Sequence, residues 1–213
     1  MCEHGGAMKA IDVIHDEHRV IRDFIDKVQI SLELLAKGEH PPRRFFELAV
    51  QFTKDYIERF HHFKEELVLF VKLAERMGGK IDAHIDSLRE QHNRSRFFIS
   101  EVIQSLEGYE KGNQGLTNNL FSNFGYYTSL ERAHLNRENH VFIPLISQQF
   151  SDAEQEEFVE IFRQEERHLG EGYLDDCMAI LGEMTQLLET QYMHQYKYLL
   201  DSVSSKRVRW AAA

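Results

Sequence analysis

Cysteine and proline are scarce in this chain, which has two cysteines and three prolines among its 213 residues. Cys2 and Cys177 are too few for a disulfide framework, so a packed core must hold the fold together. No apolar stretch approaches the roughly 20 residues of a membrane helix, and the amino terminus lacks a basic region followed by an apolar run. These absences predict a soluble, cytoplasmic protein.

Basic residues are also in the minority, because 25 Lys and Arg stand against 35 Asp and Glu, giving a formal net charge of −10. Such a surface repels phosphate backbones and anionic lipids. We therefore expect neither a nucleic acid nor a membrane as partner. The apolar content of 42% is sufficient for a substantial core in one main domain with an extension.

Two stretches of the chain are repeated. Residues 18–33 match residues 92–107 at an offset of 74, and residues 58–68 match residues 131–141 at an offset of 73. Each copy contains a lone histidine and, some forty residues later, a His-x-x-x-Glu motif. These residues are His18, His61 and Glu65 in the first copy and His92, His134 and Glu138 in the second.

Glycines divide the chain into long segments, and each segment has helical periodicity. In the first and third segments, apolar residues alternate at intervals of three and four, a spacing typical of antiparallel bundles, and His18 and His92 lie within these stripes. The midpoints between successive histidines fall in expected turns near residues 39, 76 and 113. The sequence thus predicts an all-α, up-down-up-down four-helix bundle made of a duplicated helical hairpin.

We expect residues 1–150 to form this bundle and residues 151–203 to form additional C-terminal helices. The extension begins with a capping box at Ser151 and Glu154. Its last segment carries an apolar stripe that must be covered, either by packing back over the bundle or by a second subunit in a homodimer. Residues 204–213 are expected to be a flexible tail.

A single histidine in an apolar stripe is more often a core residue than a ligand. Several polar groups that converge in an apolar core differ, because their desolvation costs several kcal/mol per charge unless cations compensate it. The joint pattern therefore predicts a two-metal site. The predicted terminal ligands are His18, His61, His92 and His134, and the predicted bridging ligands are Glu65 and Glu138.

These motifs resemble the hemerythrin-like (HHE cation-binding) family over about residues 8–150, where they read DEHRVI, HHFKEE, EQHNRSR and HLNREN. The resemblance implies two iron ions bridged by oxide or hydroxide, although the donors also suit zinc or manganese. It also implies that oxygen-carrying members place two histidines on the third helix at i and i+4. In this chain the residues four positions before and after His92 are Leu88 and Arg96. The third segment therefore offers one histidine, which leaves about two coordination positions open.

Other residues are candidates for the space around the metals. Tyr127 lies seven residues before His134 and is a candidate hydrogen-bond donor in catalysis, although a core aromatic is the simpler interpretation. Glu165 shares a face with apolar residues of the extension and is a candidate extra ligand. His15, three residues before a predicted ligand, is a third candidate.

The second motif has an ambiguous register, because either His61 and Glu65 or His62 and Glu66 can supply the ligands. The repeat favours the first pair, since leucine and asparagine stand at the positions of the second pair in the other copy. His62, about 100° from its neighbour on an α-helix, is then expected at the periphery. Glu58 and its repeat partner Glu131 either orient imidazoles or pair with arginines.

Open coordination positions favour a di-iron oxidoreductase that binds or reacts with O2, peroxide or nitric oxide. The alternative is a non-catalytic module, a metal-dependent sensor or an iron-delivery or repair protein, so the sequence does not settle whether the protein is an enzyme. A ferritin-like carboxylate site ranks below both. It needs an inward glutamate where His18 and His92 stand.

Overall fold

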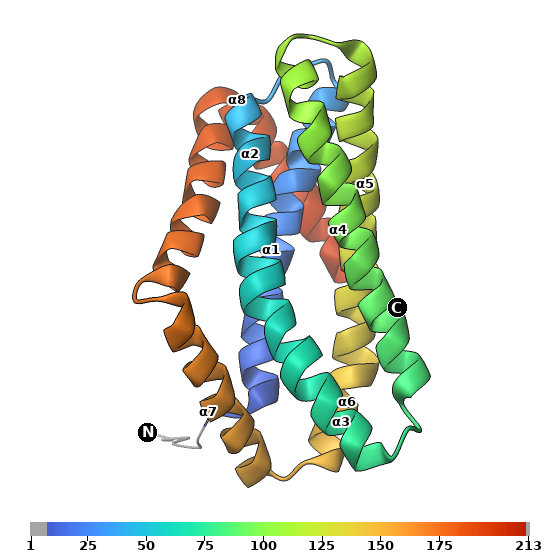
Figure 1. Cartoon of the computed structure of the whole chain (residues 1–213). Helices are drawn as coiled ribbons and strands as arrows, with labels where there is room; N and C mark the ends of the chain where they lie inside the picture. The colour runs from blue at the N-terminus through green and yellow to red at the C-terminus, as the bar shows by residue number, and fades with distance from the viewer. Residues whose placement is uncertain (1–7, 212–213) are drawn as a thin grey trace.

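The computed structural model describes the backbone of residues 8–211 and the side chains of residues 8–200, apart from that of residue 194. All regular structure in this range is helical, and four helical rods lie side by side (Figure 1). The first rod is α1 (Ala10–Ala36) and the third is α4 (Asp82–Glu110). The second and fourth rods include π-helical pieces and consist of α2 (Arg43–Phe52), η1 (Thr53–His61), η2 (Lys64–Leu69) and α3 (Phe70–Met77), and of α5 (Gln114–Arg137), η3 (Glu138–Phe142) and α6 (Ile143–Gln149).

The rods end where the sequence changes its local preference. Gly78 ends α3 with φ 57° and ψ 48°, a left-handed conformation that glycine adopts without steric cost. Asn113 begins α5 by accepting a hydrogen bond from the amide of Leu116 on its side chain. These signals place the turns between rods close to the positions expected from the repeat.

The π-helical pieces accompany the repeated motif. The amide of Phe70 donates to the carbonyl of Glu65, and the amide of Ile143 donates to the carbonyl of Glu138. Both bonds span five residues instead of the four of an α-helix, so the backbone widens at the same point of each copy. The internal duplication therefore extends from the side chains to the backbone.

The apolar core is divided into two clusters along the bundle. In α1, Ile14 belongs to one cluster and Ile21 to the other, and the buried His18 lies between them. In α4, Leu88 belongs to the first cluster, Ile99 belongs to the second, and the intervening buried residues are polar. A layer of polar side chains therefore crosses an otherwise apolar interior.

Helix α7 (Asp152–Leu169) covers the cluster that contains Ile14. Ser151 and Glu154 form the predicted capping box at its start, and Phe158 and Phe162 are buried in the cluster. The extension is therefore part of the folded core and not a separate appendage.

Helix α8 (Tyr173–Ala211) lies against α1 and α2, and its Met184 and Leu188 are fully buried in the larger cluster. Its apolar stripe is thus covered within the chain. The helix is interrupted at Tyr192, which has φ −134° and ψ 30°. It continues to Ala211, so residues 204–211 are helical where the sequence predicted a flexible tail, and residues 212–213 lie outside the described part.

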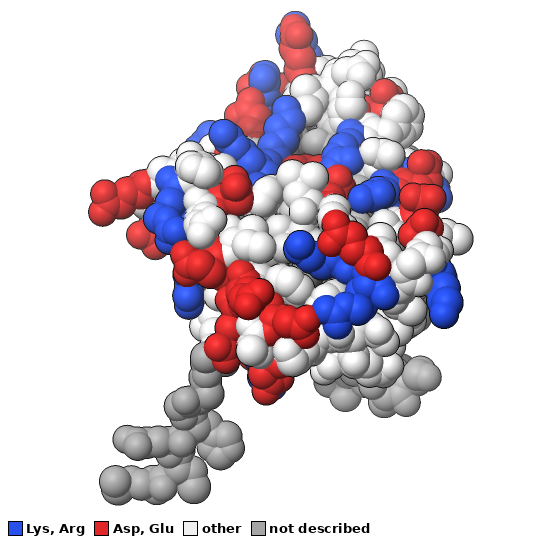
Figure 2. All heavy atoms as spheres, turned by 60° about the horizontal axis from the view of Figure 1, so that its bottom comes forward, with Lys and Arg blue, Asp and Glu red and all other residues white. Residues whose placement is uncertain are grey.

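The surface carries charges of both signs. At the end of the bundle that faces the viewer in Figure 2, Lys and Arg side chains lie among Asp and Glu. Ion pairs also join helices, such as Arg76 of α3 and Glu154 of α7 at 2.5 Å. Among the described residues, no helix combines the length and apolar character needed to cross a bilayer.

Candidate metal centre

Two groups of buried donor residues meet in the polar layer. The first group is His18, His61, Glu65 and Glu138, and the second is His62, Glu65, His92 and His134. Within each group, one donor atom of every residue lies within 4.8 Å of the others. The structure therefore brings together all six residues that the sequence predicted as ligands and adds His62.

Glu65 belongs to both groups, and Glu138 of the first group also approaches a histidine of the second. Glu65 has Oε1 3.7 Å from His18 Nε2 and Oε2 3.6 Å from His92 Nε2. Glu138 has Oε2 3.4 Å from His18 Nε2 and Oε1 3.0 Å from His134 Nε2. Each carboxylate thus presents one oxygen to a histidine of each group.

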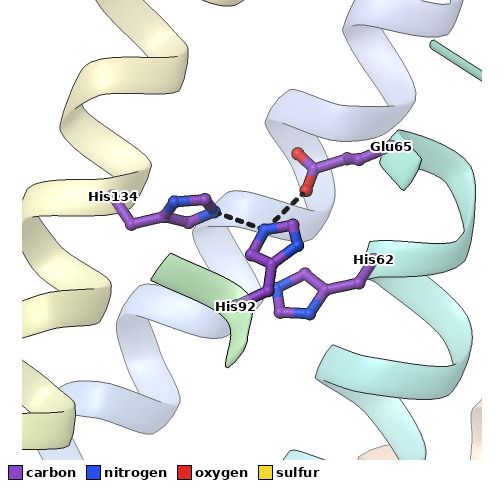
Figure 3. Close-up of side chains that lie close together, drawn as sticks. All are labelled: His62, Glu65, His92 and His134. Carbon is purple, nitrogen blue, oxygen red and sulfur yellow. Dashed lines mark hydrogen bonds and ion pairs between the residues drawn. The ribbon is translucent and has the colours of Figure 1, made fainter. Parts of the chain in front are cut away.

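Most of the atoms that face one another here have no hydrogen-bond partner. They are Nε2 of His18 and His61 and all four carboxylate oxygens of Glu65 and Glu138. The Nε2 atoms of His92 and His134 approach each other at 2.9 Å (Figure 3). Buried polar atoms without partners cost several kcal/mol, and cations between the groups would satisfy these atoms together. The donor set therefore fits two metal ions.

His62 lies inside the centre, and the expectation that it sits at the periphery was wrong. Its ring stacks on that of His92, with centroids 3.6 Å apart and planes 13° apart (Figure 3). Its amide donates to the carbonyl of Ile57, five residues earlier, which is a π-helical bond. Because a π turn holds more residues than an α turn, successive side chains are separated by less than about 100°, and both His61 and His62 face inward.

The outer nitrogen of each motif histidine donates to an acceptor. His61 Nδ1 donates to Glu17 Oε2 at 2.8 Å, and His134 Nδ1 donates to Gln91 Oε1 at 2.9 Å. Both acceptors directly precede the lone histidine of the same copy, so they occupy equivalent positions in the repeat. The duplication therefore includes the residues that hold the imidazoles.

The lone histidines follow a complementary pattern. His18 Nδ1 donates to Asn139 Oδ1 at 3.1 Å, and His92 Nδ1 donates to Glu66 Oε1 at 2.5 Å. Each acceptor directly follows the glutamate of the His-x-x-x-Glu motif in the other copy. An imidazole that donates from Nδ1 keeps its lone pair on Nε2, so these bonds fix the tautomer that aims Nε2 at the centre.

The electrostatics of the centre favour positive charge. Burial lowers the pKa of His18, but the carboxylates of Glu138 and Glu65 outweigh burial and raise it to about 10. The pKa of His134 is likewise raised to about 9. By contrast, burial and the neighbouring imidazoles hold the pKa of His62 well below its usual value, which leaves this ring neutral and able to donate a lone pair.

A buried lysine closes the outer layer beside His61. Lys64 Nζ donates to Glu17 Oε1 at 2.5 Å and lies 3.0 Å from Glu166 Oε1 of α7. Its side chain is 0% exposed, and its ammonium lies 3.3 Å from the ring centroid of Phe60. Burial raises the pKa of Glu17, but Lys64 and His61 outweigh burial and hold it below its usual range.

Tyr127 is buried outside the two donor groups. Its hydroxyl accepts a hydrogen bond from Thr53 Oγ1 at 3.4 Å, and its ring packs edge-on against Phe24 and Phe124. Burial raises its pKa well above the usual value, so the phenol stays protonated. These contacts match the core-aromatic interpretation.

Glu58 and Glu131 have different environments despite their equivalent positions. Glu58 Oε2 accepts from Arg96 Nε at 2.6 Å and lies 3.5 Å from Nδ1 of His62. It therefore pairs with an arginine, as one of the two expected roles required, but it makes no hydrogen bond that orients an imidazole. The buried Glu131 accepts from the hydroxyl of Ser95 and fulfils neither role.

Glu165 does not reach the centre, so the suggestion of an extra ligand there was wrong. Its side chain is 44% exposed, and Oε2 lies 3.2 Å from His168 Nδ1. Glu166, four residues after Phe162, faces inward instead and lies 3.0 Å from the buried ammonium of Lys64. His15 is also exposed and belongs to neither donor group.

The residues that hold the imidazoles were missed from the sequence. Their signal was their position, because each is adjacent to a predicted ligand at equivalent points of the repeat. Their chemical types differ between the copies, Glu17 against Gln91 and Glu66 against Asn139, so they are not among the identities of the repeat.

Fold and site together define a helical-bundle protein whose interior holds a buried histidine and glutamate centre suited to cations. A family model described as "Hemerythrin HHE cation binding domain" matches residues 9–146. The chain belongs to this family, which therefore covers the four rods and not the α7 and α8 extension.

Curated proteins that resemble the chain share about a quarter of its aligned residues. The chain is similar to "Uncharacterized protein Mb2018" of Mycobacterium bovis and "Uncharacterized protein Rv1995" of Mycobacterium tuberculosis, each 26% identical over 181 residues. These alignments cover 84% of this chain and 70% of each relative, so the likeness includes part of the extension. No solved structure matches the chain significantly.

Proposed function

We propose that the protein is a non-haem di-iron protein that binds and reacts with O2, peroxide or nitric oxide. The observation that carries this proposal is the pair of buried donor groups that share Glu65, with Glu138 of the first group also 3.0 Å from His134 of the second, and most of their facing atoms have no hydrogen-bond partner. Family membership supports a cation, and among the metals that suit imidazole and carboxylate we propose iron over zinc or manganese.

The two groups differ in their number of imidazoles. One contains His18 and His61, and the other contains His62, His92 and His134. If each cation takes about six ligands, including a shared oxide or hydroxide, five imidazoles and two bridging carboxylates leave about one position open. That position would lie on the side of His18 and His61, the residues that would hold a cation with a place for a small molecule.

Iron supplies the redox chemistry when it is bound, and the chain supplies orientation and shielding. The four Nδ1 hydrogen bonds keep the imidazoles from rotating as ligands bind and leave. The apolar clusters on both sides of the layer exclude bulk water. Both features favour a diatomic molecule or peroxide over larger substrates.

Absorption spectra of iron-loaded protein test this function. We expect a ligand-to-metal absorption band that changes when peroxide or nitric oxide is added under controlled atmosphere. The matched pair of variants is Glu138→Ala, which removes a buried carboxylate that approaches both His18 and His134, and Glu165→Ala, which removes an exposed one. The band should disappear only in the first variant.

The absence of any band, and of any response to either oxidant, would contradict the di-iron proposal. A band and a response without multiple turnover would favour the sensor or iron-delivery alternative over an oxidoreductase. Stopped-flow measurement of peroxide consumption per iron pair separates these two outcomes.

A further inference from the structure

The two halves of the centre differ in the charge of their outer layer. In the first copy, His61 is held by a carboxylate, Glu17, which is paired with the buried ammonium of Lys64. In the second copy, His134 is held by the neutral amide of Gln91. The position equivalent to Lys64 is Arg137, which is exposed and donates to Ser87 at 2.9 Å. The repeat is therefore symmetric in position but not in charge.

Helix α7 contributes to the surroundings of the buried Lys64. Its ammonium lies between Glu17 on one side and Glu166 of α7, at 3.0 Å, on the other. The ring of Phe162, also in α7, lies 5.9 Å from the same ammonium. Since the family match ends at residue 146, this contact comes from a part of the chain outside the matched domain.

One carboxylate is enough to balance the charge of a buried lysine. Lys64 has two carboxylate partners, Glu17 and Glu166. Glu17 is 5% exposed and directly engages a donor of the centre, whereas the Glu166 side chain is 35% exposed and reaches solvent. Charges in a partly buried setting interact more strongly than in water. The charges of Glu17, Lys64 and Glu166 therefore all act on His61 and on a cation beside it.

We propose that Lys64 is a positioning residue that, between Glu17 and Glu166, fixes the imidazole of His61 and sets the charge around it, so that α7 tunes the cation bound on that side. The inference rests on the proposed binding of iron but not on any reaction with oxidants. Carboxylates that hold ligand imidazoles increase ligand basicity, and Lys64 moderates this effect for one of the two cations.

The test compares midpoint potentials of iron-loaded full-length variants by anaerobic spectroelectrochemical titration. Lys64→Met removes a buried positive charge. The loss of this charge stabilises the more highly charged oxidised iron, so the midpoint potential should fall. Glu166→Gln removes a negative charge and should shift the potential upward by a smaller amount. A merely structural defect would not produce shifts of opposite sign.

The chain offers a control for each variant. Arg137→Met removes the exposed cation at the equivalent position of the second copy, and Glu165→Gln removes the exposed carboxylate next to Glu166. Both should leave the potential unchanged, because solvent screens exposed charges. Equal potentials for Lys64→Met and Arg137→Met, or shifts of the same sign for Lys64→Met and Glu166→Gln, would overturn the proposal.

A double variant protects the test against misfolding. Glu17→Gln with Lys64→Met reproduces the neutral arrangement of the second copy and removes opposite charges together, so it should fold and return the potential towards that of the unmodified protein. Cobalt(II) binding gives a readout without redox chemistry. One of the two sites should bind Co(II) roughly tenfold more tightly in Lys64→Met, the expected effect of one unit charge in a partly buried setting.

These measurements separate the inference from the proposed function. If the iron-loaded, unmodified protein reacts with neither peroxide nor nitric oxide, the proposed function is contradicted. The potential shifts of the variants can still be measured and still test the role of Lys64. If the protein takes up no iron, the Co(II) affinities decide, and an unchanged affinity in Lys64→Met overturns the role of Lys64.

Discussion

Each imidazole of the centre has one nitrogen directed inward. In four of them the other nitrogen, Nδ1, donates to a side-chain acceptor; these four are His18, His61, His92 and His134. The two nitrogens have different roles, so single side chains can be tested separately. Loss of a metal-donor histidine and loss of the acceptor that holds it should have different effects. Removing a donor changes how many metals bind, and removing an acceptor changes how firmly they are held.

Replacing His62 by leucine removes a donor from the group with three imidazoles while keeping a buried side chain of similar bulk. We expect the iron content to fall from about two ions to about one per chain, because His92 and His134 alone do not complete that side. Metal analysis of gel-filtered protein measures the change. His140→Leu is the control, since His140 is exposed and belongs to neither group.

Two ions per chain in His62→Leu, bound as firmly as in the unmodified protein, would show that His62 is a neighbour of the centre and not a ligand. The count of open positions would then return to about two.

The raised pKa values of His18, about 10, and His134, about 9, predict how stability depends on pH without metal. A histidine whose pKa is raised by folding contributes stability that is fully present below its ordinary value of 6.5 and is lost as the pH rises through the raised value. Metal-free protein should therefore lose stability above about pH 7, by up to about 1.4 kcal/mol per pH unit for each proton.

Metal-loaded protein should not show this loss, because cations replace the protons and bind more tightly as the imidazoles deprotonate. Thermal unfolding followed by circular dichroism between about pH 7 and pH 9.5, with and without metal, compares the two forms. Profiles that run parallel over this range would contradict the replacement of protons by cations.

Among the elements, the hairpin of α4 and α5 depends on a close approach at Gly108. A Cβ at this position would lie 2.8 Å from Cβ of Leu116 and closer still to the end of that side chain. Gly108→Ala should therefore cost about 1–3 kcal/mol through overpacking. Urea unfolding of the metal-loaded protein measures this change.

Gly125 of α5 provides the matched control. Nothing lies within 4 Å of a Cβ built there, and the residue is within the helix. Gly125→Ala should stabilise the protein by roughly 0.5–1 kcal/mol, because alanine loses less conformational freedom in a helix. If both variants were equally stable, the close packing at Gly108 would be wrong.

The π turns have a role that the α-helical elements lack. The bonds that end at the carbonyls of Glu65 and Glu138 occur at equivalent points, and the one that ends at Ile57 belongs to the motif with two adjacent histidines. A wider turn changes the direction of the side chains that follow it, so it determines which residues of a polar motif face inward. In the second copy, where leucine and asparagine follow the ligands, the motif supplies one histidine.

At the scale of the whole molecule, α8 is part of the core, since Leu188 and Met184 are fully buried against the bundle. Leu188→Ala should lower the free energy of unfolding by about 2–5 kcal/mol, the usual result of a large cavity. Chemical unfolding with a single transition measures it, and the exposed neighbour Gln186 supplies the control Gln186→Ala.

The metal content should remain unchanged in Leu188→Ala, because none of the described side chains of α8 belongs to either donor group. A change in oligomeric state with unchanged unfolding would instead show that the stripe of α8 is covered by a second subunit. Gel filtration with light scattering distinguishes these outcomes.

The sequence by itself determined the helical class and the six residues that meet in the centre. Periodicity places His18 and His92 on inward stripes, and the repeat places a His-x-x-x-Glu motif opposite each of them. Both signals depend only on helical spacing, which is local and is preserved when the chain folds. For the same reason the capping box at Ser151 and the turn at Gly78 could be read from neighbouring residues.

Only the tertiary structure decided which way His62, Lys64 and Glu166 face. The direction of His62 depends on a π-helical bond that spacing rules for an α-helix do not anticipate. Lys64 is buried among residues of α1, η1 and α7, and nothing in its own sequence neighbourhood indicates the contact with Glu166, about a hundred positions away. These orientations result from competition among packed elements, whereas helical spacing results from the backbone alone.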